Sequence, residues 1–557
     1  MQELYQELIS NIKEKDYSPK QLAKLKRDLS LKYGQETIPT NINILLNAKK
    51  EDLAGIKKKI ITKPVRTISG VSPVAVMTKP SKCPHGKCTF CPGGLNSPWG
   101  DVPQSYTGHE PATMRGIRND YDPYLQVFNR LEQYIVLGHS IDKIEVIVMG
   151  GTFPAEEKKY QEEFIYGIFK ALNDFSELFY DEEFNLLKFK EFFELPGDIY
   201  NKERAGRVKG KLLEWKQKNI LSLEKEQERN ETAKIRCVAL CIETKPDWGF
   251  LAQGNEMLKQ GCTRVEIGVQ SVYDDVLLKV HRGHTAKDSK RSIRELRDLG
   301  FKINLHYMPG LPLTGKERDI EGLKELFSDP DYKPDMIKIY PCMIGPGTAL
   351  FYEYQQGNFT PLSTSQAAEI IVELKKVIPE YCRIQRIQRD VPTKMWEAGV
   401  DRTNLRQFIH ENYKFKCRCI RCREPKDKEI HWEKVRIKEI EYEASKSKEF
   451  FIAAEDHEND LLVGFCRLRF PSSSLREEIT PHSALIRELH VYGTATAIGD
   501  EGLVQHKGLG RKLMERAEGL ARDNGKDKMV VISGVGVRQY YEKLGYKKEG
   551  PYMVKLL

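Results

Sequence analysis

The sequence lacks the features of a membrane or secreted protein. Nowhere do its 557 residues contain the roughly 18 or more consecutive apolar residues that a membrane-spanning helix needs. The first residues, Met1-Gln-Glu-Leu-Tyr, form no apolar signal core. A disulfide framework is missing too, because six of the 12 cysteines are grouped in two short, metal-like clusters, which fits a reducing compartment. These absences predict a cytoplasmic protein with no membrane partner.

The charge of the chain is unevenly distributed. Its length allows two large domains, and the formal net charge is +9. Residues 1–82 and residues 383–438 each hold 16 Lys and Arg against 8 Asp and Glu. Such blocks are typical of a surface that binds a polyanion, although a solvated helix surface has the same composition. The two blocks together favour RNA. The first block is expected to bind it through Lys24, Lys26, Arg27, Lys57, Lys58 and Lys59.

Alternating strands and helices predict an α/β protein. The expected units are a small helical basic region (1–70), a partial or full (β/α) barrel (71–382), a basic linker (383–430) and a second α/β domain (431–557). In the first unit, Ser18-Pro19 predicts the start of a helix. The apolar face of that helix is expected to hold Leu22, Leu25, Leu29 and Leu31. The barrel strands are expected at 74–77, 144–149, 235–242, 264–269, 302–307 and 336–340.

A compact cysteine motif follows the first expected strand. It reads Cys83-Pro-His-Gly-Lys-Cys88-Thr-Phe-Cys91. A 4Fe-4S cluster normally takes four thiolates, so three would leave one iron open to a small molecule. The motif resembles that of radical S-adenosylmethionine (SAM) enzymes, in which SAM chelates the open iron. Its first gap is one residue longer than is common there. A zinc knuckle is the alternative, since CxxC is also zinc spacing.

Glycines and polar residues at the ends of later strands favour the cluster. Gly150, Gly151 and Thr152 end one strand, Glu243 ends the next, and Gln270 ends a third. Barrel enzymes keep their sites at this end of the strands, so these residues are expected to contact SAM. Each could instead be a structural residue of the barrel rim, but their order behind the cysteines favours a site.

The C-terminal unit carries a second set of motifs. Gln505-His-Lys-Gly508-Leu509-Gly510 precedes a helical run and resembles the pyrophosphate loop of GNAT acetyltransferases. Glycines there expose backbone amides at a helix N-terminus, which favours the CoA pyrophosphate. The preceding strand would pair with pantetheine through Glu488, Leu489, His490 and Val491. Tyr540, Tyr541 and Glu488 are the catalytic candidates, with Tyr540 preferred for the thioester. Tyr541 could be core, and Glu488 could pair with an arginine.

A second cysteine trio lies in the linker. Cys417, Cys419 and Cys422 fall within six residues among basic side chains, which favours metal binding. A structural zinc site needs four ligands, and Cys382 or His410 could supply the fourth. Zinc is favoured over a second iron–sulfur cluster.

Motifs along nearly the whole chain resemble the catalytic subunit of Elongator, a family of tRNA-modifying enzymes. The matching stretches are Lys63–Gly70, Gln104–Gly108, Val148–Phe153, Gln385–Asp390, Arg487–Gly493 and Gly550–Lys555. Radical SAM joined to GNAT is an uncommon pairing, which makes the resemblance specific. The linker trio is not universal in that family.

The resemblance implies that the chain forms 5-carboxymethyluridine at the wobble position of tRNA, from SAM and acetyl-CoA. It also implies an electron donor and a role for Lys143 in binding acetyl-CoA. A homodimer is left open. The alternative is a protein lysine acetyltransferase with a structural iron–sulfur domain. A requirement for SAM and a reductant separates the two.

Overall fold

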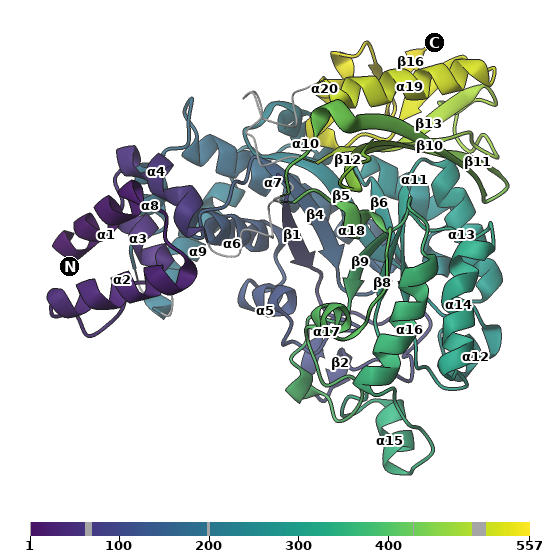
Figure 1. The fold of residues 1–557 in the computed structure, drawn as a ribbon, viewed down its shortest axis with the longest axis horizontal. Coiled ribbons are helices and arrows are strands. Elements are labelled where there is room, and N and C mark those ends of the chain that lie inside the picture. The colour runs from purple at the N-terminus through teal and green to yellow at the C-terminus, as the bar shows by residue number, and fades with distance from the viewer. Residues whose placement is uncertain (1, 62–69, 198–200, 427, 493–507) are drawn as a thin grey trace.

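The computed structural model describes residues 2–61, 70–197, 201–426, 428–492 and 508–557. A helical bundle at the N-terminus projects from one side of the molecule and packs beside helix Pro123–Val136 (α6) (Figure 1). Its helices are Gln2–Glu14 (α1), Pro19–Lys32 (α2), Asn41–Asn47 (α3) and Lys50–Ile60 (α4). Ser18 caps α2 with a capping box, and Pro19 is its first residue, which confirms the predicted start. Leu22 and Leu29 are buried as expected, but Leu31 is 73% exposed, so its place on the apolar face was wrong.

The middle of the chain forms a seven-stranded parallel sheet in the order β1-β4-β5-β6-β7-β8-β9. Its strands are Ser72–Met77 (β1), Lys143–Met149 (β4), Arg236–Thr244 (β5), Arg264–Gln270 (β6), Lys302–Tyr307 (β7), Met336–Ile339 (β8) and Arg383–Ile387 (β9). Six of them confirm the predicted strands to within two residues at each end. No described strand pairs β9 with β1, so the barrel is open.

The seventh strand corrects one predicted boundary. Strand β9 pairs in parallel with β8, so the first sheet continues past residue 382 into the expected linker. The strand was missed because its composition is basic rather than apolar. Ile384 and Ile387 are buried, whereas Arg383, Gln385 and Arg386 are partly exposed.

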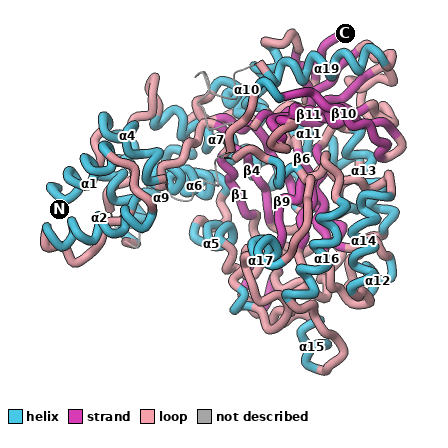
Figure 2. Tube along the Cα trace, viewed as in Figure 1, coloured by secondary structure: helices cyan, strands magenta, loops and turns pink. Residues whose placement is uncertain are grey.

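Helices cover the outer face of the first sheet, and smaller elements surround it (Figure 2). The covering helices are Pro123–Val136 (α6), Lys158–Phe179 (α7), Leu251–Lys259 (α11), Ala286–Asp298 (α13), Lys316–Ser328 (α14) and Thr364–Val377 (α16). The insert between β4 and β5 adds Leu186–Phe192 (α8), Lys202–Lys216 (α9) and Leu223–Thr232 (α10). Beyond the carboxyl ends of the strands lie Gly94–Ser97 (β2), Gly100–Val102 (β3), Pro111–Arg118 (α5), Asp274–Lys279 (α12) and Ala349–Gln355 (α15). The segment after β9 forms Leu405–Asn412 (α17) and Ile420–Arg423 (α18).

The C-terminal domain is a second seven-stranded sheet in the order β10-β11-β12-β13-β14-β16-β15. Its strands are Val435–Ala444 (β10), Ser447–Asp456 (β11), Leu461–Arg469 (β12), Ser483–Val491 (β13), Lys528–Val531 (β14), Lys547–Glu549 (β15) and Tyr552–Leu556 (β16). Helix Leu509–Asp523 (α19) covers one face, and Arg538–Glu542 (α20) lies at the edge. The other face joins the core of the first domain.

Buried ion pairs join the two sheets. Arg487 of β13 contacts Asp335 at 2.6 Å, and Asp335 directly precedes β8. Arg467 of β12 lies 3.3 Å from the same carboxylate. Arg469 reaches Asp298 at the end of α13, again at 2.6 Å. Because these acidic residues precede strands of the first sheet or end its helices, the second sheet is docked on the amino-terminal edge of the first. Among the described residues, no helix is long and apolar enough to cross a membrane.

Candidate active site

The cysteine motif lies beyond the carboxyl end of β1. Cys88 and Cys91 are buried and Cys83 is partly exposed. The turn after β4 approaches this loop closely, because a side chain at Gly150 would come within 1.9 Å of the Thr78 hydroxyl. Gly150 also has φ of 132°, a conformation that suits glycine. Thr152 follows with its hydroxyl 4.0 Å from the Cys83 thiol. The structure thus brings together the predicted cysteines and the predicted glycine turn.

Polar groups surround the three thiols. The backbone N–H of Ser105 donates to Cys91 at 3.3 Å. His85 and Arg282 lie 3.2 and 3.6 Å from the Cys88 sulfur. Burial raises the pKa of the Cys83 thiol to about 11, so a thiolate there needs a positively charged partner. Donors and a nearby guanidinium fit a bound metal cluster, because hydrogen bonds to the ligand sulfurs tune such clusters.

Some residues of this shell were not predicted. Gln104 accepts a hydrogen bond from the Cys91 thiol at 3.0 Å. Its segment, Gln104–Gly108, resembles the Elongator family, and that resemblance does not predict a contact with the cysteines. Arg282 comes from the connection after α12, far along the sequence, and no local pattern marks it. Only the folding of β6 and α12 over the cysteine loop brings it there.

The polar residues predicted at later strand ends lie at the same edge of the sheet. Glu243 is at the end of β5 and accepts a hydrogen bond from the Tyr106 hydroxyl at 2.9 Å. Gln270 ends β6 with φ of 69°, an uncommon conformation for a residue with a side chain. Parallel strands end at one edge, so both residues lie on the side of the cysteine loop.

The second predicted site lies in the C-terminal domain, where two strands separate. Strand β13 pairs in parallel with β14 only from Ser483 to Ile486. Among the strands that the structure describes, Glu488–Val491 pairs with β12 alone. The backbone groups of Leu489–Val491 on the other edge are therefore available to an extended ligand. This geometry is the one predicted for a pantetheine arm.

The glycine loop precedes α19 as predicted. Gly508 has φ of 70° and leaves the helix N-terminus without a side-chain cap. A side chain at Gly510 would come within 2.7 Å of the Tyr540 hydroxyl, so Tyr540 packs directly on this turn. Gln505, His506 and Lys507 lie outside the described residues. Tyr540 is 39% exposed and Tyr541 is buried. Burial raises the pKa of Tyr540 to about 12, so its hydroxyl stays protonated near neutral pH.

Glu488 lies at the boundary between the domains. Its carboxylate accepts from Lys302 of β7 at 2.5 Å and from Arg467 at 2.9 Å. Burial alone would raise its pKa, but the charges of Lys302 and Arg467 lower it to about 2. A carboxylate with that pKa is a weak base at neutral pH. Its ion pairs give it a structural role across the boundary.

Lys143 begins β4 at the same amino-terminal edge. It is the register partner of Arg236 on β5. The Arg236 guanidinium donates to the side chain of Gln539, the residue before Tyr540, at 3.4 Å. Burial lowers the pKa of Lys143. Lys143 therefore lies beside the C-terminal domain, as a role in binding acetyl-CoA would require.

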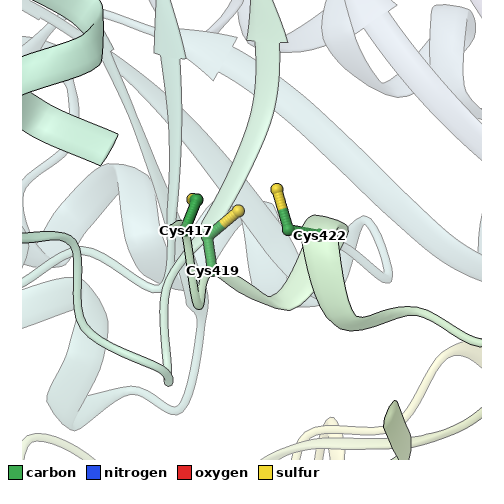
Figure 3. Close-up of side chains that lie close together, drawn as sticks. All are labelled: Cys417, Cys419 and Cys422. Atoms are coloured by element: carbon green, nitrogen blue, oxygen red, sulfur yellow. The ribbon is translucent and has the colours of Figure 1, made fainter. Parts of the chain in front are cut away.

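The linker cysteines point toward one another (Figure 3). The sulfurs of Cys417, Cys419 and Cys422 all lie within 4.8 Å of one another. The Lys375 ammonium is 3.6 Å from Cys422. Within the described part of the chain, neither Cys382 nor His410 joins this group. Three convergent thiols fit a single metal ion, with a fourth ligand from elsewhere.

The predicted basic residues of the bundle differ in their surroundings. Lys24, Arg27 and Lys58 are exposed. Lys26 is buried and its ammonium contacts Asn41, so this structure does not present it to a partner. Lys57 is partly buried. Lys59 pairs with Asp16 at 3.0 Å.

Models of known families match four parts of the chain. The ELP3 N-terminal domain matches residues 1–68, and the Radical SAM superfamily matches residues 212–321. The Radical SAM C-terminal domain matches residues 334–414, and the Acetyltransferase (GNAT) family matches residues 417–546. The fold and the two sites thus define an enzyme that combines a radical SAM half-barrel with a GNAT acetyltransferase domain.

Relatives cover almost the whole chain. The tRNA uridine(34) acetyltransferase of Methanocaldococcus infernus is 44% identical over 93% of this chain and 92% of its own length. The human Elongator complex protein 3 is 39% identical over 96% of this chain and 93% of its own. The solved structure of M. infernus Elp3 lacking residues 1–46 has a TM-score of 0.71 at 39% identity, over 88% of this chain and all of that one. The chain belongs to the Elongator complex protein 3 family.

Proposed function

We propose that this protein modifies the wobble uridine of tRNA, with SAM and acetyl-CoA as co-substrates, to give 5-carboxymethyluridine. One observation carries the proposal: the cysteine loop and the strand expected to bind acetyl-CoA lie at opposite ends of one parallel sheet. The contact of Lys302 with Glu488 joins the acetyl-CoA end directly to that sheet. A single catalyst that uses both co-substrates needs them held in a fixed relative position, from which the acetyl end can reach the radical.

The cysteine end would hold a 4Fe-4S cluster and SAM. Cys83, Cys88 and Cys91 would be the ligands of the cluster, which when bound would supply the electron for reductive cleavage of SAM to a 5′-deoxyadenosyl radical. The residues expected to hold SAM are Gly150, Gly151, Thr152, Glu243 and Gln270. An external donor has to deliver the electron. The protein positions the reactants and excludes water.

The bonds that change belong to the acetyl group and the uracil ring. The radical takes a hydrogen atom from the acetyl methyl group, and the methyl carbon then bonds to C5 of uracil. The hydrogen at C5 leaves as a proton, and the remaining unpaired electron passes to a one-electron acceptor, a role that the oxidised cluster would fill, which restores the ring. Water hydrolyses the thioester and releases CoA. Leu489–Val491 and Gly508–Gly510 would hold the CoA portion, with Tyr540 and Lys143 beside it.

The remaining features support binding of tRNA and of a structural metal. Lys24, Arg27 and Lys58 are exposed on the bundle and available to phosphates. Cys417, Cys419 and Cys422 would hold zinc, which fixes the linker between the two sheets. The reaction is assigned to the cytoplasm, where tRNA and reduced thiols coexist.

The test is anaerobic reconstitution with tRNA, SAM, acetyl-CoA and dithionite, followed by nucleoside mass spectrometry. We expect 5-carboxymethyluridine only in the complete mixture, and none with a tRNA whose wobble base is cytidine. Product formed without SAM would contradict the proposal. A lysine acetyltransferase would need a general base, and the ion-paired Glu488 with its pKa of about 2 is unsuited to that role.

A further inference from the structure

The inner face of the first sheet is partly exposed along β4 and β7, whereas its outer face is sealed by helices. In β4, Ile144, Val146 and Val148 are fully buried. The alternate residues, among them Lys143 and Glu145, are partly exposed. Because side chains alternate between the two faces of a strand, these partly exposed residues point to the inside of the open barrel. In β7, His306 is likewise partly exposed between the buried Leu305 and Tyr307.

Polar side chains line this inner face instead of the apolar layers usual in barrels. They form a connected set, here called the inner-face network: Tyr106, Glu145, Glu243, Arg264, Glu266, His306 and Lys338. Glu266 lies at its centre and is fully buried. It accepts from His306 at 2.9 Å, from Arg264 at 3.3 Å, and from Lys338.

The network reaches both ends of the barrel. Toward the cysteine end, Lys338 lies 3.7 Å from Glu243, which accepts from Tyr106 at 2.9 Å. Tyr106 directly follows Ser105, whose N–H donates to Cys91 at 3.3 Å. Toward the other end, Arg264 pairs with Glu145. Arg264 is also the register partner of Lys302 on β7.

Beyond Lys302 lies β13, the strand that is expected to bind acetyl-CoA. Lys302 donates to Glu488 at 2.5 Å, and Glu488 precedes the residues expected to pair with pantetheine. Burial lowers the pKa of the neighbouring His490 to about 4, and the charges of Glu488 and Glu145 oppose this shift. A row of polar side chains therefore runs inside the barrel from one predicted site to the other.

Stability does not account for this network. Buried ion pairs cost desolvation and are often no more stabilising than well-packed apolar residues. Strand β4 is about 20 Å long at the rise of an extended chain, so the acetyl group has to cross much of the barrel to meet a radical formed at the cysteine end. A polar inner face that is partly exposed at Glu145, Glu243 and His306 is suited to hold a thioester on that path.

We propose that the acetyl end of acetyl-CoA enters the barrel beside Lys302 and lies along the inner-face network, with Lys338 and His306 as positioning residues that orient its methyl group toward the cysteine end. This inference rests on the proposed function and deepens it. Both side chains can donate a hydrogen bond to the thioester carbonyl, and both are held by Glu266. They form no bond with the substrate carbon.

The test uses acetyl-CoA with a trideuterated methyl group and measures deuterium in the 5′-deoxyadenosine formed. In the unaltered protein, deuterium transfer is expected, and its absence would overturn the proposed function itself. In Lys338→Met and His306→Gln, we expect 5′-deoxyadenosine to form still. Its deuterium content should fall by up to about 10²-fold, because a misplacement of about 1 Å has effects of this size.

Three controls keep the result interpretable. Lys338→Arg retains the charge and should recover part of the transfer, while Lys287→Met removes an exposed lysine of α13 and should change nothing. Iron content and the rate of SAM cleavage are measured in every variant. If deuterium transfer is unchanged in both inner-face variants, the inference is wrong. It is equally wrong if iron, SAM cleavage and transfer fall together, since the network would then be structural.

Discussion

The two ends of the parallel sheet are built in opposite ways. At the carboxyl end, loops meet around three thiols, and Gly150, Gly151 and Gln270 have positive φ. At the amino end, Asp335, Arg467 and Arg487 are fully buried and paired. Loops that carry chemistry need unusual backbone conformations, whereas a docked interface needs satisfied charges. The comparison shows that the two tasks are divided between the ends of one sheet. The carboxyl end carries the reactive loops, and the amino end holds the C-terminal domain.

The largest effect should come from the carboxyl end. Cys88→Ala removes one of three predicted cluster ligands, so we expect loss of bound iron and of tRNA modification. Acetyl-CoA binding should stay, because that site is at the other end of the sheet. Iron analysis measures the bound iron, and calorimetry measures the binding of acetyl-CoA. Cys262→Ala, at a buried cysteine outside the trio, is the matched control. Full modification by the Cys88 variant would contradict the account.

The next largest effect should come from the glycine loop at the amino end. Gly508→Asp puts a negative charge where the pyrophosphate should meet backbone amides, and we expect acetyl-CoA affinity to fall by about 10²-fold, which is about 2.7 kcal/mol. Modification of tRNA should fall with it, while iron content does not change. Gly508→Asn is the control, since Asn tolerates the positive φ of 70° and carries no charge. Equal losses in both variants would show that strain, and not charge, is responsible.

The docked interface itself can be broken at Asp335. Asp335→Asn removes one of the two counter-charges of Arg487 and of Arg467, which keep Glu449 and Glu488 respectively, so we expect a loss of about 3 kcal/mol in the free energy of unfolding. Urea denaturation measures it, with the exposed Asp523→Asn as control.

The same carboxylate predicts a dependence on pH. Burial would raise the pKa of Asp335, but Arg487 and Arg467 lower it well below its ordinary value. Its contribution is therefore present above a pH of about 4 and is lost as the pH falls toward the lowered pKa. A variant with unchanged stability and an unchanged acid profile would contradict the role of this interface.

The smallest effect is expected away from both ends, on the N-terminal bundle. Reversing charge at Lys24 and Arg27 should weaken tRNA binding and lower the salt slope by about 0.7–0.9 per lost phosphate contact. Reversing the exposed Lys287 and Lys324 on the barrel helices is the control. The same slope in both variants would show that the bundle lysines and arginine are only solvated.

Local patterns predicted much of this molecule because its strands are short apolar runs and its motifs are contiguous. The cysteine loop, the glycine turn at Gly150 and the glycine loop before α19 all follow from such patterns. Strand β9 was missed because its inward residues are basic. Arg282, Tyr106 and the contact of Lys302 with Glu488 were missed for another reason. Each joins segments far apart in the chain, so only the folded sheet brings them together.

The central claim is that both ends of the sheet serve one reaction. The most direct measurement is mass spectrometry of the tRNA nucleosides after reaction with trideuterated acetyl-CoA, SAM and dithionite. The account predicts 5-carboxymethyluridine with two deuterium atoms on the new carbon and the third in 5′-deoxyadenosine. Unlabelled 5-carboxymethyluridine, formed while labelled acetyl-CoA is the only donor present, would contradict it.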